Sequence, residues 1–478
     1  MDLPESHPLI RAKRRAGRIK RYLKRKWWER NIGKQYKAWL ADSLQREPGS
    51  IDNAVPIAVI IPVFNPPPRF LTECLASVTG QTARNWQLIV SDDGSTEPEV
   101  RALLDEFAKE HQDDTRVAVI RGENSGISAA QNRALEHVTC EYFGWLDHDD
   151  QLNPRAIELM SETIAKSSAP PQVVYSDEDK IDGKGEHYEL YCKPDFSPEL
   201  LLTQMYLCHF TVFRTELVRN HGGFRSEMDG AQDFDLALRL LPELDNVQHI
   251  ALPLYHWRAW SGSTALTIDA KPWAQEAAAR AQQAHLDRTT GGTVQPSPTP
   301  GLNEVHPSIG NPPLVSVIIP TIGTRNTKGT ARFVDEAIRS LREAESHVPL
   351  EIIAVTTGEI DPIPGVDNQV VYQPSGTFNF AEAINLGRAH ATGEFLLLLN
   401  DDTTADSADP VTRLLELGQL QGVGAVGAKL TYPDGRLQHT GLVLMPSGPT
   451  HVHIAKSGNF TGYFGSTLTP RNYSAVTA

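Results

Sequence analysis

The chain has 478 residues, a formal net charge of −14 and 40% hydrophobic residues, enough for two or three hydrophobic cores at about 150 residues per domain. No apolar run approaches the roughly 20 residues that span a bilayer, and the charged N-terminus is unlike a secretory signal, so we expect an intracellular protein. The four cysteines show no paired short spacing, so they indicate neither a zinc site nor a disulfide framework.

A dense basic run lies between Arg11 and Lys37, with Glu29 as its single acid. Apolar residues recur there at helical spacing: Ile19, Leu23, Trp27, Trp28, Ile32, Tyr36 and Leu40. The pattern predicts a basic amphipathic helical arm over residues 1–50. Cationic side chains opposite paired tryptophans suit an anionic membrane surface, which we expect residues 11–40 to contact. The alternatives are a helix packed on the following domain, and binding of nucleic acid or another acidic partner.

From residue 55, short β-branched runs alternate with helical patterns. The predicted strands are 57–63, 87–90, 117–120 and 142–146, and the predicted helices lie near 69–80, 97–111 and 126–137. This alternation implies crossover connections and a mainly parallel sheet. Ligands of such sheets bind beyond the carboxyl ends of the strands. The polar residues that follow predicted strand ends are Asn65, Asp92, Asp93, Asp147 and Asp149.

The acidic segment WLDHDD, Trp145 to Asp150, stands at one of these strand ends. Clustered carboxylates suit a hard divalent cation such as Mg²⁺ or Mn²⁺, which can neutralise a diphosphate. A solvated strand exit with a helix cap is the alternative. The Asp-Asp-Gly-Ser run after the second strand has a similar alternative, because it is also ordinary turn chemistry.

Six segments carry a resemblance to a known family. They are IPVFN (61–65), SDDGS (91–95), NSGISAAQN (124–132), WLDHDD (145–150), GAQDFDLALR (230–239) and YHWR (255–258). Their order over residues 55–265 resembles the family 2 glycosyltransferases, which implies a GT-A fold: an α/β domain with a Rossmann-like, mainly parallel sheet. On this basis we expect residues 55–288 to be the catalytic domain.

The resemblance also implies roles at the donor site. Asp92 and Asp93 would hold the base and ribose of a nucleotide sugar, and Asp147 and Asp149 would bind a divalent metal and the diphosphate. The full set predicted to bind the nucleotide sugar is Pro62, Asn65, Asp92, Asp93, Asn124, Asn132, Asp147 and Arg258.

A transferase of this kind needs a base for the acceptor hydroxyl, and a carboxylate is adequate when a metal carries the leaving-group charge. Asp233 and Asp235 lie at the start of a predicted helix. By resemblance Asp233 is the base and Asp235 is its rival. Gln232 stands where the family often has Glu, and its amide is expected to orient the acceptor. A carboxylate that only favours the helix start is the alternative for Asp233.

Further residues are predicted to complete the site. His256 is expected as a third metal ligand and Arg258 as a diphosphate clamp, with a purely structural histidine as the alternative. Asp177, Glu178 and Asp179 in YSDEDK, together with Gly223, are expected to face the acceptor. The alternative for the three acids is a solvated loop.

The second half of the chain repeats the first. Residues 289–313 are rich in Gly, Pro, Ser and Thr and are predicted to be a linker. Beyond it, 315–320 echoes 57–62, and 385–402 echoes 132–149. We therefore expect residues 314–478 to be a second, incomplete GT-A-like domain.

This second copy looks degenerate. Thr356 and Thr357 replace the two donor carboxylates, and Asn400 replaces Asp147, although Asp402 keeps the position of Asp149. No counterpart of the base is present, so we expect a truncated domain. The chain is interpreted either as a shortened two-site enzyme or as a short protein whose second unit stabilises or binds.

The leading hypothesis is an inverting, metal-assisted transferase that uses a nucleoside-diphosphate sugar and a saccharide or lipid-linked acceptor in bacterial cell-surface polysaccharide or O-antigen synthesis. We expect it in the cytoplasm, with the arm at the inner membrane face, and without a nucleic-acid partner. A non-catalytic nucleotide-sugar-binding or scaffold protein for a partner transferase is the alternative. A nucleotidyltransferase is the third interpretation, against which the GAQDFD and YHWR segments argue.

Overall fold

The computed structural model describes residues 33–44, 55–260, 272–326, 329–344, 346–374 and 376–477. The chain forms two compact units. The first runs to His285 and takes in Val294–Glu304, and the second takes Leu286–Thr293 and the chain from Val305 onward. Within the described residues, no helix combines the length and the apolar character that a membrane crossing requires.

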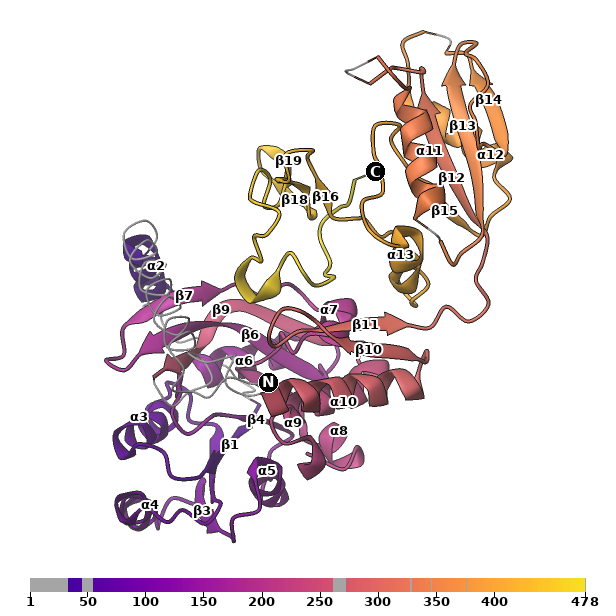
Figure 1. The fold of residues 1–478 in the computed structure, drawn as a ribbon. Coiled ribbons are helices and arrows are strands. Elements are labelled where there is room, and N and C mark those ends of the chain that lie inside the picture. The colour runs from indigo at the N-terminus through magenta and orange to yellow at the C-terminus, as the bar shows by residue number, and fades with distance from the viewer. Residues whose placement is uncertain are drawn as a thin grey trace, which may run out of the picture. The chain divides into compact units, whose positions relative to one another are not determined.

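The first unit begins with a parallel α/β layer (Figure 1). Strands β1 (Ile57–Val63), β2 (Trp86–Asp92), β3 (Val117–Arg121) and β4 (Tyr142–Trp145) pair in parallel in the order β3-β2-β1-β4. The crossover helices are α3 (Pro68–Thr79), α4 (Pro98–Glu110) and α5 (Ile127–Glu136). All seven residues of β1 are buried, because α3 and α4 cover one face of the sheet and α5 covers the other.

The same sheet continues with antiparallel pairing. Its further strands are β5 (Gln151–Leu152), β6 (Val173–Asp182), β7 (His187–Tyr191), β8 (Thr211–Arg214) and β9 (Val247–Ala259). Strand β8 runs antiparallel to both β4 and β6, whereas β6 and β9 are parallel. The α/β class and the largely parallel central sheet are therefore confirmed, and the antiparallel β8 is an addition that local periodicity did not reveal.

Short helices surround this second part of the sheet. They are α6 (Ala156–Lys166), α7 (Pro198–Thr203), α8 (Thr215–Asn220), α9 (Gln232–Leu240) and the 3₁₀ turns η2 (Ser226–Met228) and η3 (Leu241–Glu243). Helix α9 buries Leu236 and Leu240 in the same cluster as α5. Its N-terminal turn carries Asp233 and Asp235.

The described part of the predicted arm is helix α2 (Lys34–Leu44). Its apolar side packs on the first unit, where Tyr36 and Leu40 cluster with Tyr188 and Ala259. This packing matches the interpretation of a helix docked on the following domain. Most of the segment predicted to contact a membrane, residues 11–32, lies outside the described residues, so that contact stays a prediction.

The predicted linker contains secondary structure. Helix α10 (Pro272–Arg288) precedes it, and strands β10 (Gly292–Pro296) and β11 (Asn303–Pro307) pair within it as a two-stranded sheet. These strands contain β-branched residues that favour extended backbone, namely Thr293, Val294 and Val305. The Gly, Pro, Ser and Thr residues that suggested a linker lie largely in the turns around them.

The second unit repeats the parallel layer of the first. Strands β12 (Val315–Thr321), β13 (Leu350–Thr357), β14 (Asn368–Tyr372) and β15 (Phe395–Leu398) pair in parallel in the order β14-β13-β12-β15. The helices are α11 (Phe333–Glu343), α12 (Phe380–His390) and α13 (Pro410–Gly418). Because this order equals that of β3-β2-β1-β4, the sequence repeat is also a repeat of fold.

The end of the second unit has little regular structure. It consists of β16 (Leu430–Thr431), β17 (Leu437–His439), β18 (Leu442–Met445), β19 (Gly448–His451) and the 3₁₀ turn η6 (Tyr463–Gly465). Strands β16 and β17 form one two-stranded sheet, and β18 and β19 form another.

Candidate active site

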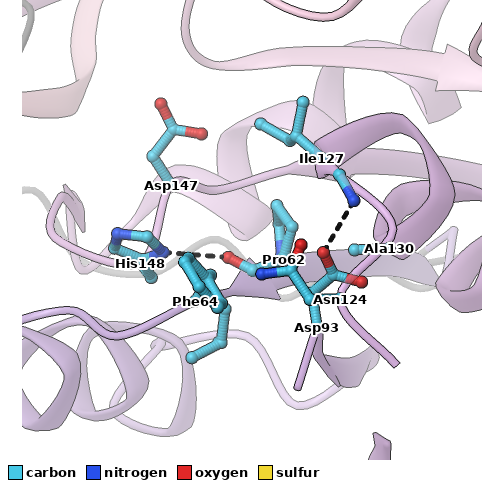
Figure 2. Close-up of a pocket in the computed structure, with 10 residues that line it drawn as sticks. Pro62, Phe64, Asp93, Asn124, Ile127, Ala130, Asp147 and His148 are labelled. Atoms are coloured by element: carbon cyan, nitrogen blue, oxygen red, sulfur yellow. Dashed lines mark hydrogen bonds between the residues drawn. The ribbon is translucent and has the colours of Figure 1, made fainter. Parts of the chain in front are cut away.

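A pocket lies at the carboxyl ends of β1, β2 and β4, where a parallel α/β sheet is expected to bind its ligand. Its volume of ≈ 330 Å³ is within the range of small-molecule sites. The lining residues are Pro62, Val63, Phe64, Asp93, Asn124, Gly126, Ile127, Ala130, Asp147 and His148 (Figure 2). Four residues predicted to bind the nucleotide sugar, namely Pro62, Asp93, Asn124 and Asp147, are thus brought together.

The two carboxylates after β2 have different surroundings. Asp93 Oδ2 accepts hydrogen bonds from the backbone N–H groups of Ser125 and Gly126 at 3.1 and 2.9 Å, and Arg133 lies 3.3 Å from Oδ1. Asp92 Oδ1 instead accepts from Ser95 N at 3.0 Å and shapes the turn. Asp93 therefore faces the pocket at the N-terminus of α5, whereas Asp92 supports the loop behind it.

Two of the predicted asparagines, Asn65 and Asn132, are not among the residues that line the pocket. Asn65 Oδ1 accepts from the backbone N–H groups of Thr96 and Glu97 at 2.9 and 3.0 Å, which joins the end of β1 to the entry of α4. Asn132 exchanges two hydrogen bonds with the backbone of Phe224, at 2.7 and 2.9 Å. Their binding roles stay predictions, since the contacts they make here are with protein.

The acidic loop after β4 separates into two kinds of carboxylate. Asp150 is buried, and burial together with Asp149 and Asp147 raises its pKa well above the ordinary value. It accepts hydrogen bonds from Tyr255 Oη at 2.5 Å and from the backbone N–H of Arg258 at 2.7 Å. Asp150 is therefore a structural residue of this loop.

Asp147 and Asp149 remain partly exposed. Asp147 lines the pocket, and Asp149 Oδ2 accepts a hydrogen bond from Trp260 Nε1 at 2.7 Å. Two carboxylates at an accessible edge, beside a third that is buried, fit the oxygen-donor preference of Mg²⁺ or Mn²⁺. The residues present are thus compatible with the predicted divalent metal.

Arg258 is fully buried rather than open to the pocket. Its guanidinium donates to the backbone carbonyl of Asp149 and to Glu73, both at 2.7 Å, and lies over the Phe70 ring. Its contacts hold the acidic loop in place. The diphosphate clamp stays a prediction that would require these contacts to change.

His256 lies on β9 and turns its ring toward β6. Its Nδ1 is 2.6 Å from Asp179 Oδ1, and its ring packs edge-on against His187. A role as third ligand beside Asp147 and Asp149 stays a prediction.

Asp233 and Asp235, the two candidate bases, differ in their partners. Asp235 is buried and held by Arg225 and by Arg239, with Nε to Oδ2 distances of 2.9 and 3.0 Å. Asp233 is less buried, and its pKa is raised, first by burial and further by the charge of Asp147. A raised pKa suits a proton acceptor near neutral pH, so the geometry favours Asp233 over its rival.

The acids predicted to face the acceptor are interior residues of β6. Asp177 lies 2.9 Å from His249 Nε2, Glu178 lies 3.1 Å from Lys193 Nζ, and Asp179 contacts His256. Burial alone would raise the pKa of Glu178, but Lys193 and His209 outweigh it and lower that pKa to about 2. The acceptor role of the three acids stays a prediction.

Gly223 and Gln232, also predicted on the acceptor side, shape the segment before and at the start of α9. Gly223 has a φ of 66°, and a Cβ there would lie 2.4 Å from Asn132 Oδ1. Gln232 Oε1 accepts from the backbone N–H of Gly230 at 3.0 Å. Both positions are thus used in the local fold.

His209 is a site residue that the sequence analysis missed. It stacks on Tyr255, and its Nε2 lies 4.0 Å from Asp147 Oδ2 while its Nδ1 lies 3.4 Å from Glu178 Oε2. Burial opposes its charge, but Glu178, Asp147 and Asp150 raise its pKa to about 9. The signal available in sequence was a lone histidine in the apolar run YLCHFTVF.

Residues 58–222 match the sequence model of the family described as Glycosyl transferase family 2. This segment is a family 2 glycosyltransferase domain. Four of the six motifs lie within the matched residues, from IPVFN to WLDHDD. Asp233, His256 and Arg258 follow the matched segment, so their roles depend on the geometry described above.

Relatives extend the similarity along the chain. An uncharacterized protein of Sinorhizobium fredii, y4gI, is 38% identical over 465 residues, which are 94% of this chain and 50% of the relative. The O-antigen biosynthesis protein RfbC of Myxococcus xanthus is 31% identical over 465 residues, 93% of this chain and 35% of the relative. The chain therefore spans half the length of these curated relatives or less.

Among solved structures, the S. aureus TarS 1–349 complex with UDP-GlcNAc is similar at 18% identity and a TM-score of 0.39, over 48% of this chain and 66% of that one.

At the end of β13 in the second unit, Thr356 and Thr357 stand at the positions that Asp92 and Asp93 occupy in the first. Asp401 remains after β15, and its Oδ2 accepts a hydrogen bond from Thr321 Oγ1 at 2.6 Å. Burial raises the pKa of Asp401. Within the described residues of the second unit, Asp401 and Asp402 thus remain after β15, while no acid stands at the positions of Asp92 and Asp93.

Replacement of Asp235 by Asn should destabilise the protein by about 3 kcal/mol, because Arg225 and Arg239 would lose their shared buried carboxylate. Urea unfolding at pH 7 measures the change. Asp233→Asn is the matched control on the same helix and should be neutral or stabilising, since burial disfavours that charge. Equal destabilisation by both variants would contradict the interpretation that Asp235, and not Asp233, stabilises the fold.

His209 should make stability depend on pH in metal-free buffer. Because its native pKa of about 9 exceeds the ordinary 6.5, its protonated form stabilises the fold fully below pH 6.5, by roughly 3 kcal/mol. This contribution should disappear as the pH rises through 9. The measurement is the free energy of unfolding of the parent and of His209→Gln from pH 6 to pH 9.5. We expect the difference between the two proteins to shrink as the pH rises. A constant difference would refute the raised pKa of His209.

Proposed function

We propose that the first unit transfers a sugar from a nucleoside-diphosphate sugar to a saccharide or lipid-linked acceptor, with inversion at the anomeric carbon. The observation that carries the proposal is the pocket at the carboxyl ends of β1, β2 and β4, which brings Asp93, Asn124 and Asp147 together within the segment that matches family 2. In this proposal Asp233, on α9, supplies the proton acceptor for that pocket.

In this proposal the carboxylates of Asp147 and Asp149 hold a divalent metal, Mg²⁺ or Mn²⁺. That ion would neutralise charge on the departing diphosphate. Asp93 and Asn124 line the same pocket. In this proposal they bind the nucleotide, and Asp93 would accept hydrogen bonds from the ribose or base.

Asp233 acts as the base. The acceptor oxygen forms its bond to the anomeric carbon as the bond to the diphosphate oxygen breaks, and the hydroxyl proton passes to the Asp233 carboxylate. The diphosphate leaves with the bonding electron pair. A single displacement of this kind inverts the configuration.

The setting in bacterial cell-surface polysaccharide synthesis is supported by the similarity to a protein named for O-antigen biosynthesis. The basic run between Arg11 and Lys37 would suit a lipid-linked acceptor at an anionic membrane face. Both are proposals for this chain, since it covers only part of that relative.

Asp233→Asn should lower the rate of sugar transfer by roughly 10²–10⁴-fold, the usual contribution of a general base. The measurement is release of nucleoside diphosphate, with a panel of nucleotide sugars, acceptors and Mn²⁺.

Binding separates this function from a non-catalytic scaffold. The donor with Mn²⁺ should raise the melting temperature of the parent and of Asp233→Asn alike, since a ligand of the folded state stabilises it, whereas Asp147→Asn should lose that Mn²⁺-dependent increase. Transfer rates that are equal in the parent and in Asp233→Asn would reject Asp233 as the base. Donor binding with no transfer by the parent under any condition of the panel would favour the scaffold.

A further inference from the structure

The buried carboxylate of Asp179, which does not line the pocket, contacts three polar side chains from three other elements. Asp179 on β6 accepts from Tyr36 Oη of α2 at 2.6 Å, and its oxygens lie 2.8 Å from His187 Nδ1 on β7 and 2.6 Å from His256 Nδ1 on β9. Asp179 is 0% exposed, whereas the His187 side chain is 30% exposed. The cluster is thus interior but reachable from one side.

We propose that Asp179, His187 and His256 bind one zinc ion, with the Tyr36 hydroxyl, which contacts Asp179, as the fourth donor. His256 is thus assigned to zinc instead of to the predicted metal at Asp147 and Asp149, and Asp179 to zinc instead of to the acceptor. Two imidazole nitrogens and a carboxylate are ordinary zinc ligands, and structural sites take four donors. The three ligand atoms already lie within 4.8 Å of one another. The two imidazole rings stand nearly perpendicular, at 84°, with centroids 4.5 Å apart.

The sheet holds these ligands in place before any ion arrives. In the β6–β9 register Asp179 lies directly opposite His256, and in the β6–β7 register His187 lies opposite Ile181, two residues along from Asp179. The β6–β7 pairing shifts register between Glu178 and Lys180, so it is the contacts of the three side chains that show them to meet: both imidazoles lie within 2.8 Å of the Asp179 carboxylate.

Zinc binding would require the ligand atoms to adjust. Ligand atoms on one tetrahedral zinc lie about 3.3 Å apart, so the two hydrogen-bonded pairs must separate by roughly half an ångström, and the two imidazole nitrogens, which lie within 4.8 Å of each other, must reach the same spacing. Zinc takes a deprotonated carboxylate and neutral imidazoles as its ligands, so its binding at this cluster would depend on pH.

A second cluster with metal-ligand chemistry, Glu178, Cys208 and His209, is a weaker candidate. Lys193 Nζ lies 3.1 Å from Glu178 Oε2, so an ammonium group already neutralises that carboxylate and would repel an entering cation. At the Asp179 cluster, the three groups that contact the carboxylate are a hydroxyl and two imidazoles.

Zinc at this site would fasten the N-terminal helix to the sheet. Helix α2 already contacts β7 through Tyr36 and Leu40 on Tyr188, and Lys37 pairs with Glu186. The ion would add bonds from β6, β7 and β9 at the point where Tyr36 enters. Because metal binding is coupled to folding, it would also stabilise the whole unit.

The test uses the full chain carrying Asp147→Asn and Asp149→Asn, so that the proposed catalytic metal cannot contribute. Zinc sulfate is added, and the zinc that remains after desalting is measured by mass spectrometry, with affinity from competition against a chelator. We expect one equivalent of zinc, and the visible absorption of tetrahedral Co²⁺ when cobalt is used instead.

His187→Ala in that background should weaken zinc binding by more than about 10-fold and abolish the tetrahedral Co²⁺ spectrum. His187 is partly exposed and outside the proposed transfer machinery, so the variant should fold, which circular dichroism checks. His221→Ala is the matched control, because His221 pairs with the single carboxylate of Glu243, and it should keep the zinc. Tyr36→Phe should retain the ion with lower affinity.

Absence of retained zinc in the parent background, or equal retention in His187→Ala, would overturn the proposal and leave the cluster as a hydrogen-bonded latch for α2. The proposed sugar transfer stands independently, because its test uses Asp233 and Asp147 in a chain with His187 intact. Loss of transfer with zinc still bound would reject the function and keep the metal site.

Discussion

The buried carboxylate of Asp150 is the interaction on which the geometry of the pocket depends. It accepts from Tyr255 Oη at 2.5 Å and from Arg258 N at 2.7 Å, which ties the loop after β4 to strand β9, more than a hundred residues later. Arg258 adds a bond to the carbonyl of Asp149. A loop with several like charges would otherwise spread apart, because close carboxylates repel one another. Fixing one of them in the interior leaves Asp147 and Asp149 at the edge of the pocket.

The internal repeat shows what this arrangement requires. Both units build the same four-stranded parallel layer, yet Phe143 and Trp145 of β4 are buried, whereas Leu396 and Leu398 at the matching positions of β15 are exposed. In the first unit β8 and the elements that follow cover that face and supply Tyr255 and Asp233. A parallel layer alone therefore provides the donor edge, and the later, antiparallel part of the sheet provides the rest of the site.

The contrast between the parallel layer and the later part of the sheet also explains how much of the structure could be predicted from the sequence. Strands β1 to β4, their crossover helices and the pocket residues Asp93 and Asp147 followed from local periodicity and from motifs at strand ends. Strand β8 and the burial of Asp177, Glu178 and Asp179 did not, because they depend on pairing between segments far apart in the chain. His209 was missed for the same reason: its charge has a function only beside Glu178 and Asp147, which reach it from other strands.

The neighbouring acids of α9 illustrate how environment assigns different roles to like residues. Asp235 is neutralised by two arginines and anchors the helix, while Asp233, two residues away, faces His209 and Asp147, whose charges act on its pKa in opposite directions. Burial decides the balance and raises that pKa. If a divalent cation were bound at Asp147, its charge would favour the ionised form of Asp233, so occupation of the donor site would itself prepare the base.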